Sequence, residues 1–181
     1  MSLHRIDYRE LSLNPMTLFS NRWGLLCAGA PKMGFNAMTI AWGHLGALWD
    51  VPHDGPRLHG RPSATCFVRP QRHTKRFMDE GARFTISFLP EGMRKPLAVM
   101  GTRSGRDHDK FAEAGLMQTV DEAFGVAYPA EAELVLICRK LYHAGIDEHG
   151  FDVSEPLETN YPERDFHTMY VGEIEDVLAN E

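Results

Sequence analysis

The sequence predicts a mainly β protein with short helices, built as a predominantly antiparallel barrel. Three observations support this prediction: short runs in which apolar and polar residues alternate, glycine- and proline-containing turns between them, and few stretches with helical character. The chain has 181 residues, 43% of them apolar, so it can bury one sizeable core.

The first two strands are expected at residues 23–30 and 36–42, because both runs are rich in apolar residues and a turn with proline and glycine separates them. Strand side chains alternate between faces, so one face of the second strand carries Met38, Ile40 and Trp42. Its other face carries only alanine and threonine. This bare face suits either tight packing in the sheet or the close approach of a flat ligand.

The next predicted elements are a loop, a strand, a helix and a strand at residues 47–60, 64–69, 71–80 and 83–88. The loop contains two prolines and two glycines, which favour a path over the surface or across a site. Thr74 is expected to cap the helix and Gly81 to end it. In the last strand phenylalanine and isoleucine alternate with polar residues, which indicates a half-buried strand.

Two short helices and two late strands complete the prediction, at residues 93–100, 107–114, 134–142 and 168–177. Gly115 is expected to close the second of these helices. We find no internal repeat, low-complexity tract or linker with a composition shift. A single domain over residues 1–181, with a peripheral leader at 1–13, is therefore expected.

Composition and charge argue against several classes of protein. The net charge of −6 is the wrong sign for a nucleic-acid-binding surface. No apolar run approaches the roughly 20 residues of a membrane helix, and the polar start does not resemble a signal peptide, so a cytoplasmic protein is expected. The three cysteines lie far apart in apolar runs, and the nine histidines lack zinc-binding spacing. Free buried thiols and no metal site are predicted.

The loop at residues 101–110 has the composition of a phosphate site. It contains hydroxyl groups, glycines, two arginines and Lys110, and it precedes a predicted helix whose free N–H groups favour an anion. The sequence is equally compatible with an ordinary helix start capped by Asp107 and surrounded by solvated charges.

A second candidate anion site follows the strand at 64–69. Arg69, Arg72 and the Thr74 hydroxyl could converge on the same anion as the first loop. An Arg-Pro turn of this kind is also common on protein surfaces, so the pair of loops is more informative than either loop alone.

Five segments occur in a fixed order: NAMTIAWG at 36–43, VRPQRHT at 68–74, FTISF at 84–88, GTRSGRDHDKF at 101–111 and DFHTMYVGE at 165–173. Together they resemble the flavin reductase family of FMN-binding split barrels, which includes flavoredoxin-like proteins. The resemblance runs from about residue 14 to residue 177. It implies a six-stranded antiparallel split β-barrel that binds FMN.

The resemblance also implies a homodimer with FMN near the subunit interface. The cofactor would lie along Asn36, Ala37, Met38, Thr39 and Ile40, with Trp42 stacking on it, covering it or packing in the core. Its phosphate would be surrounded by Arg69, Thr74, Ser104, Gly105 and Lys110. His167 resembles a family histidine near the reactive side of the flavin, although Asp165 could instead hold it as an ordinary strand residue.

Two functions are compatible with these residues. In the first, bound FMN takes electrons from NAD(P)H and passes them to free flavin or another acceptor, with a possible redox or monooxygenase partner. In the second, the protein is a flavoredoxin-like electron carrier that a protein partner reduces. A barrel that no longer binds FMN is a weaker third alternative. No Gly-x-Gly-x-x-Gly fingerprint is present, so a nicotinamide would bind in an open cleft over the flavin.

Overall fold

The computed structural model describes residues 3–50 and 59–180. The principal feature is an antiparallel sheet of eight strands in the order β3-β2-β6-β9-β10-β5-β4, with β1 paired to β10. The strands are β1 (His4–Ile6), β2 (Gly24–Ala30), β3 (Gly34–Ile40), β4 (Gly43–Leu48), β5 (Arg61–Val68), β6 (Arg83–Phe88), β9 (Leu134–Gly145) and β10 (Thr168–Ala179). A separate hairpin joins β7 (Gln118–Asp121) to β8 (Val126–Pro129).

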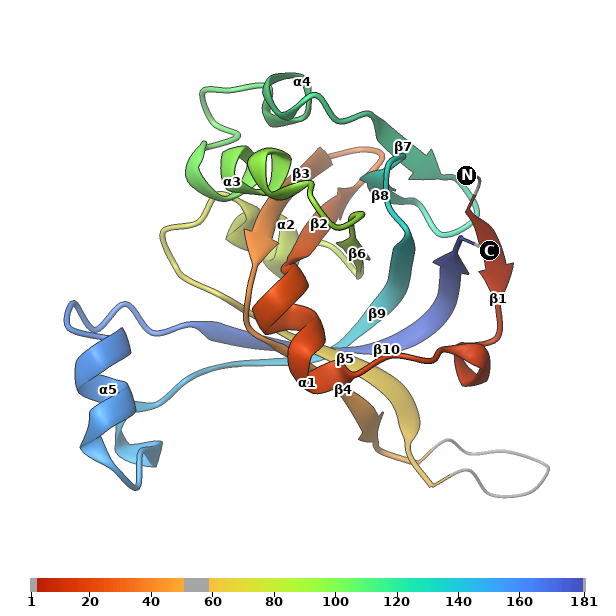
Figure 1. Cartoon of the computed structure of the whole chain (residues 1–181). Coiled ribbons are helices and arrows are strands. Elements are labelled where there is room, and N and C mark those ends of the chain that lie inside the picture. The colour runs from red at the N-terminus through yellow and green to blue at the C-terminus, as the bar shows by residue number, and fades with distance from the viewer. Residues whose placement is uncertain (1–2, 51–58, 181) are drawn as a thin grey trace.

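This architecture confirms the mainly β prediction. All six predicted strands are present, and the two further strands of the main sheet are the short β1 and β4. The predicted leader contributes β1, and Ile6, Leu11 and Leu13 pack against the core, so this stretch is more than a peripheral extension. Pairing of β1 with β10 also places the two ends of the chain side by side (Figure 1).

Strand alternation creates two cores, one on each face of the central strands. Leu26 of β2, Ile86 of β6 and Leu136 of β9 belong to one cluster. They are paired across the neighbouring strands, Leu26 with Ile86 and Ile86 with Leu136. The neighbouring residues Leu25 and Cys27 belong to the other cluster. Burial on both faces explains why these strands are almost continuously apolar, because neither face meets water.

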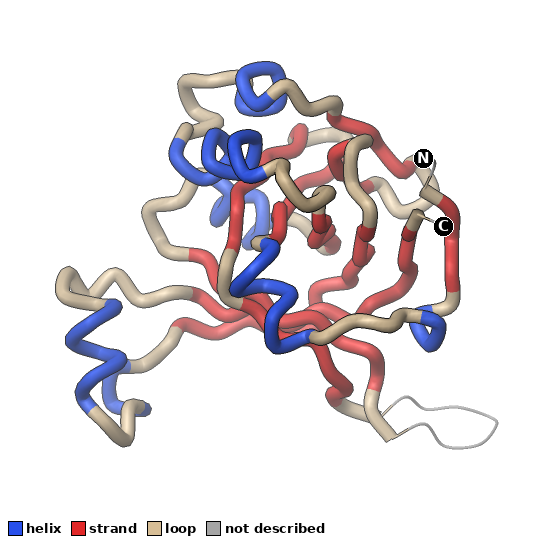
Figure 2. The backbone as a smooth tube through the Cα atoms, in the orientation of Figure 1, coloured by secondary structure: helices blue, strands red, loops and turns tan. Residues whose placement is uncertain are grey.

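The helices of the protein are short. They are α1 (Pro15–Thr17), α2 (Thr74–Glu80), α3 (Arg94–Thr102), α4 (Lys110–Ala114) and α5 (Ser154–Asn160), with one π-helical turn at Leu18–Arg22 and 3₁₀ turns at Tyr8–Glu10 and Glu148–Gly150. Helices α2, α3 and α4 gather together, whereas α5 lies apart at the end of the long β9 and β10 strands (Figure 2). We call residues 146–167, which connect these two strands, the arm.

The predicted cap of α2 is wrong, and the alternative in which Asp107 caps the next helix is not found. Thr74 makes no capping bond to α2; its hydroxyl accepts a hydrogen bond from the Asn36 amide at 2.8 Å instead. Helix α4 begins at Lys110 rather than 107, and Asp109, not Asp107, caps it by accepting from the Ala112 N–H at 3.1 Å. The predicted end of α4 is confirmed, since Gly115 adopts a left-handed conformation with φ of 66°.

Candidate functional site

A cavity of about 440 Å³ opens between the end of β3, helix α3 and the base of the arm. We call it the large cavity. Its lining is mostly apolar and aromatic: Trp23, Met38, Thr39, Ile40, Ala41, Trp42, Phe67, Arg69, Arg72, Leu97, Ala98, Gly101, Thr102 and His167. This size and composition fit a flat organic ligand.

Strand β3 forms one wall of the large cavity, and its two faces differ from each other. Met38 and Ile40 are buried in the core cluster of the barrel. On the bare face, Ala37 is 1% exposed, and the Thr39 hydroxyl donates to the Leu97 carbonyl of α3 at 2.5 Å. Packing therefore accounts for Ala37, while the end of the strand from Met38 onward borders the large cavity.

A second cavity, of about 120 Å³, adjoins the first; we call it the small cavity. Both cavities are lined by Met38, Arg72 and Thr102, so they lie next to each other. The small cavity is lined by Asn36, Met38, Gln71, Arg72, His73, Thr74, Thr102, Arg103, Ser104, Gly105, Arg106 and Lys110. No carboxylate lines it among the described residues. The fold thus brings the two predicted anion-binding loops together.

The backbone at Gly105 lies close to the Asn36 side chain in the small cavity. A Cβ atom on Gly105 would lie 2.1 Å from the Asn36 side-chain oxygen, so any larger residue at this position would have to displace that side chain. The Asn36 amide in turn donates to Thr74, which ties β3 to the start of α2. Helix α4 is one short turn in which Asp109 already accepts from the Ala112 N–H, so the lining of the small cavity comes mainly from the preceding loop and its side chains.

Lys110 is the most buried cation of the small cavity, with 6% of its surface exposed. Its ammonium donates to the Ala37 carbonyl at 2.5 Å and has no carboxylate partner among the described residues. Burial, reinforced by the nearby Arg72, lowers the pKa of Lys110 to about 8. The pKa of His73 is also lowered, by burial and by Arg106. In both residues burial is the main cause of the lowered pKa, and the neighbouring positive charges in the small cavity add to it.

Arg69 does not reach the small cavity, contrary to its predicted role. Its guanidinium binds the Asp165 carboxylate and donates to the Asn160 carbonyl at 2.8 Å, which anchors the arm to the end of β5. Arg72 lies at the boundary of the two cavities instead, and it donates to the Gly101 carbonyl at 2.8 Å. The side chains diverge because the turn after β5 directs them to different partners.

His167 lines the large cavity and is 9% exposed. Its Nδ1 lies 2.9 Å from the Tyr161 hydroxyl, and its ring packs on Trp42 with 4.9 Å between ring centres. Burial and the positive charge of Arg69 lower the pKa of His167 to about 4. Asp165 is not its hydrogen-bond partner, because that carboxylate binds Arg69 and Gln71.

Trp23 and Tyr161 were not predicted as site residues. Trp23 contributes to the large cavity from a positive φ of 60°, and the Arg94 guanidinium lies over its ring at 4.1 Å. The only sequence signal was a large aromatic residue at the start of a predicted strand. Trp49 lies outside both cavities and packs edge-on against Tyr142.

Other kinds of site are not found in the described part of the chain. It contains no group of three or more residues that could hold a metal ion. All three cysteines are buried and free, as predicted. None of its helices is long and apolar enough to cross a membrane.

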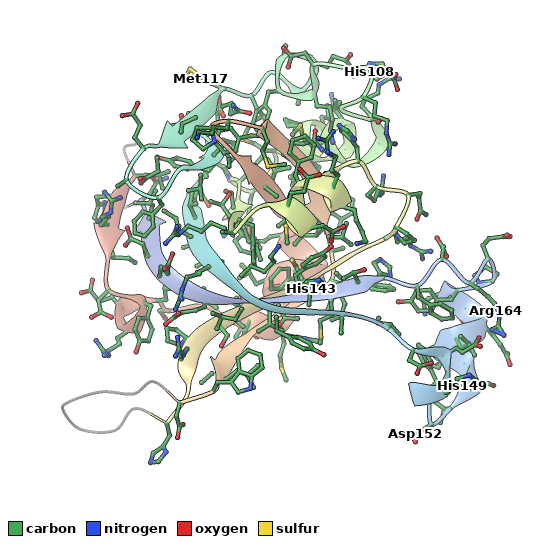
Figure 3. The ribbon with its side chains drawn as sticks, turned by 180° about the vertical axis from the view of Figure 1, so that it is seen from behind. His108, Met117, His143, His149, Asp152 and Arg164 are labelled. Carbon is green, nitrogen blue, oxygen red and sulfur yellow. The ribbon has the colours of Figure 1, made fainter. Side chains whose placement is uncertain are left out.

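Figure 3 shows labelled side chains of the arm, such as His149 and Asp152, far from His108 in the loop before α4.

Comparison with known families and structures agrees with this geometry. Residues 60–181 match the family described as flavin reductase like domain. No curated protein matches the chain.

Several solved structures share the fold. An FMN-binding domain of a flavin reductases-like enzyme from Shewanella baltica aligns with a TM-score of 0.64 and 14% identity, covering 98% of this chain and 77% of that one. Flavoredoxin of Desulfovibrio vulgaris aligns with a TM-score of 0.62 and 24% identity, covering 95% and 77%. Nitrilotriacetate monooxygenase component B from Bacillus cereus aligns with a TM-score of 0.64 and 13% identity, covering 97% and 81%. These likenesses confirm the split-barrel fold.

Proposed function

Because the chain belongs to the flavin reductase like domain family, we propose that it binds FMN and acts as an NAD(P)H-dependent oxidoreductase. When bound, FMN would supply the redox chemistry, taking a hydride from the nicotinamide and passing electrons to free flavin or another acceptor. The protein's own residues bind the cofactor, orient it and exclude water from it.

One observation carries this proposal: an aromatic-lined cavity adjoins a small cavity that, among the described residues, is lined by cations and by no carboxylate. FMN has the matching division into a flat ring system and a phosphate. In the part of the chain that the structure describes, the hydrogen-bond partner of the buried Lys110 ammonium is a carbonyl, so a phosphate would relieve the unfavourable burial of its charge. The residues present therefore fit the cofactor.

The predicted residues divide between two tasks. Thr74, Ser104, Gly105 and Lys110 would hold the phosphate, with Arg72 taking the role first expected of Arg69. Met38, Thr39, Ile40, Trp42 and His167 would surround the ring system. Asn36 and Ala37 would support these residues indirectly. The Asn36 amide donates to the Thr74 hydroxyl, and the Ala37 carbonyl accepts from the Lys110 ammonium.

We further propose that the working form is a cytoplasmic homodimer. Four aromatic or large apolar side chains are 40–47% exposed on or beside β4 and β9, namely Trp42, Leu48, Trp49 and Tyr142. Side chains of this kind are typical of the central part of protein interfaces.

A flavoredoxin-like electron carrier is the alternative, and the 24% identity with a flavoredoxin favours it. Likeness to a monooxygenase component B supports a partner enzyme that would take the reduced flavin. Anaerobic stopped-flow mixing of the FMN-loaded protein with NADH or NADPH distinguishes these roles. Rapid bleaching of the visible absorbance of the oxidised flavin supports the reductase. Negligible bleaching by both nucleotides would leave the carrier as the better description.

Cofactor binding is tested separately by titration with FMN and riboflavin. Each charge-assisted contact to the phosphate is worth about 1.5–3 kcal/mol, so FMN should bind at least tenfold more tightly. Equal affinities would place the phosphate outside the small cavity.

A further inference from the structure

We propose that Tyr161 is a positioning residue whose hydroxyl donates to Nδ1 of His167 and fixes the imidazole as an uncharged Nε2–H donor facing the large cavity. The inference concerns the site of the proposed function but depends on it only for its catalytic consequence. Tyr161 lies at the end of the arm, outside the segments that pointed to the site in the sequence.

The contact is built from rigid parts. Tyr161 is 5% exposed, and its hydroxyl lies 2.9 Å from His167 Nδ1. Its ring is enclosed by Phe166, with ring centres 4.9 Å apart, and by the Arg69 guanidinium at 5.4 Å. Its backbone N–H donates to the Leu157 carbonyl of α5 at 2.9 Å. The hydroxyl therefore has little freedom to turn away from the imidazole.

The direction of the hydrogen bond follows from which atoms lack other partners. Tyr161 has no other acceptor for its hydroxyl proton among the described residues. If Nδ1–H were the donor, this buried O–H would be unsatisfied, which costs about 1–3 kcal/mol. Donation from Tyr161 to Nδ1 satisfies both groups, so the remaining ring proton sits on Nε2.

The Nε2 atom of His167 faces the large cavity. Nε2 has no hydrogen-bond partner among the described residues. It is also not one of the described polar atoms that are both fully buried and unpaired, so part of its surface is accessible. His167 lines the cavity, with Trp42 packed on its ring and Tyr161 on its Nδ1 side. Nε2 is therefore the atom left to meet a ligand.

The charged groups around His167 keep it neutral. Burial is the main factor that opposes its protonation, and the positive charges of Arg69 and Arg72 add to it. Asp165 favours protonation, but its carboxylate is already bound by Arg69 and Gln71. Burial also raises the pKa of Tyr161, so its hydroxyl keeps the proton that it donates. The pair consequently retains one arrangement of protons through the neutral pH range.

An uncharged, fixed N–H donor suits a ring or carboxamide carbonyl of the ligand in the large cavity. It orients that oxygen without delivering a proton, because a histidine with a pKa of about 4 is not protonated at neutral pH. In the proposed reductase this interaction would align the two reacting rings. Tyr161 would contribute by keeping the donor on the correct nitrogen.

The test is the tautomer of His167, measured by ¹⁵N NMR on the full chain labelled at histidine, with and without FMN. His167→Gln assigns the signal among the nine histidines. We expect the wild type to carry its proton on Nε2 and none on Nδ1 at neutral pH. In Tyr161→Phe, which keeps the ring packing, the other tautomer should become populated by about a tenth or more. Tyr128→Phe, in β8 and outside both cavities, is the matched control and should change nothing.

Activity provides a second readout. Tyr161→Phe should slow reduction of bound FMN by NAD(P)H about three- to tenfold while leaving FMN affinity within about twofold. A proton on Nδ1 of the wild type, or an unchanged single tautomer in Tyr161→Phe, would overturn the positioning role. If NAD(P)H does not reduce the wild type, the reductase proposal fails and the tautomer alone decides the role of Tyr161.

Discussion

At the scale of single residues, Lys110 shows how burial and charge make a ligand site. Burial lowers its pKa to about 8, so in the free protein half of the Lys110 ammonium groups have lost their proton at about that pH. A phosphate ester is already fully ionised there, because its second pKa is near 6. FMN affinity should therefore begin to fall above about pH 7 and decline by up to tenfold per pH unit once the pH exceeds about 8.

Isothermal titration across this pH range measures the effect. Riboflavin, which has no phosphate, should show no such decline, and Lys110→Met should bind FMN about tenfold or more weakly with a flat pH profile. An unchanged pH dependence in Lys110→Met would show that another group is responsible.

Gly105 is the other residue on which the small cavity depends. In Gly105→Ala the new methyl group must displace the Asn36 side chain, whose amide otherwise bonds Thr74. We expect at least tenfold weaker FMN binding in fluorescence titrations and a loss of about 1–3 kcal/mol of stability. Gly46→Ala is the control, since nothing lies within 4 Å of the added atom. Equal FMN affinity in both variants would contradict the role of this close approach.

At the scale of elements, Arg69 ties the arm to the end of β5. The Arg69 guanidinium donates at the same time to the Asn160 carbonyl and to the Asp165 carboxylate. Lysine cannot reproduce this forked geometry. Arg69→Lys should therefore increase hydrogen–deuterium exchange in the arm, and it should shift the environment of His167.

Arg76→Lys is the matched control for this prediction, because the Arg76–Glu80 pair is exposed and lies within one helix. Exchange in the arm should remain at the wild-type level in that variant. Identical exchange in Arg69→Lys and the wild type would mean that packing alone holds the arm in place.

At the scale of the whole molecule, His167 links folding to pH. Its pKa is about 4 in the folded state and 6.5 in the unfolded state, so below pH 6.5 the unfolded chain takes up a proton that the folded chain does not. Its contribution to stability is thus complete above pH 6.5 and declines as the pH falls toward 4. Urea unfolding at pH 7 and 4.5 should show this loss, by at most about 3 kcal/mol from this residue. His167→Gln should lose correspondingly less stability over the same interval; a parallel loss would assign the effect elsewhere.

The proposed dimer is a second property of the whole molecule. Light scattering should give about twice the 20.4 kDa chain mass. Trp49→Glu places a charge among the exposed aromatic side chains and should raise the dimer dissociation constant about tenfold or more. Met117→Glu, at a 63% exposed site in another part of the chain, should not. A monomeric wild type that retains FMN would contradict the dimer.

The sequence by itself determined the elements whose information is local. Short apolar runs, together with alternation at 83–88, located the six main strands, and the composition of the polar loop at 101–110 predicted an anion site. Short β1 and β4 were not predicted, since three to six residues with mixed polarity carry little periodic signal.

Only the tertiary structure decided which side chains meet. Arg69 and Arg72 are three residues apart and look interchangeable in the sequence, yet one holds the arm and the other borders both cavities. Trp23 and His167 line one cavity although 144 positions separate them. The path of the chain across the sheet sets these encounters, and no local pattern encodes that path. The chemistry of the site was therefore visible in the sequence, while its geometry arises from the packing of distant segments.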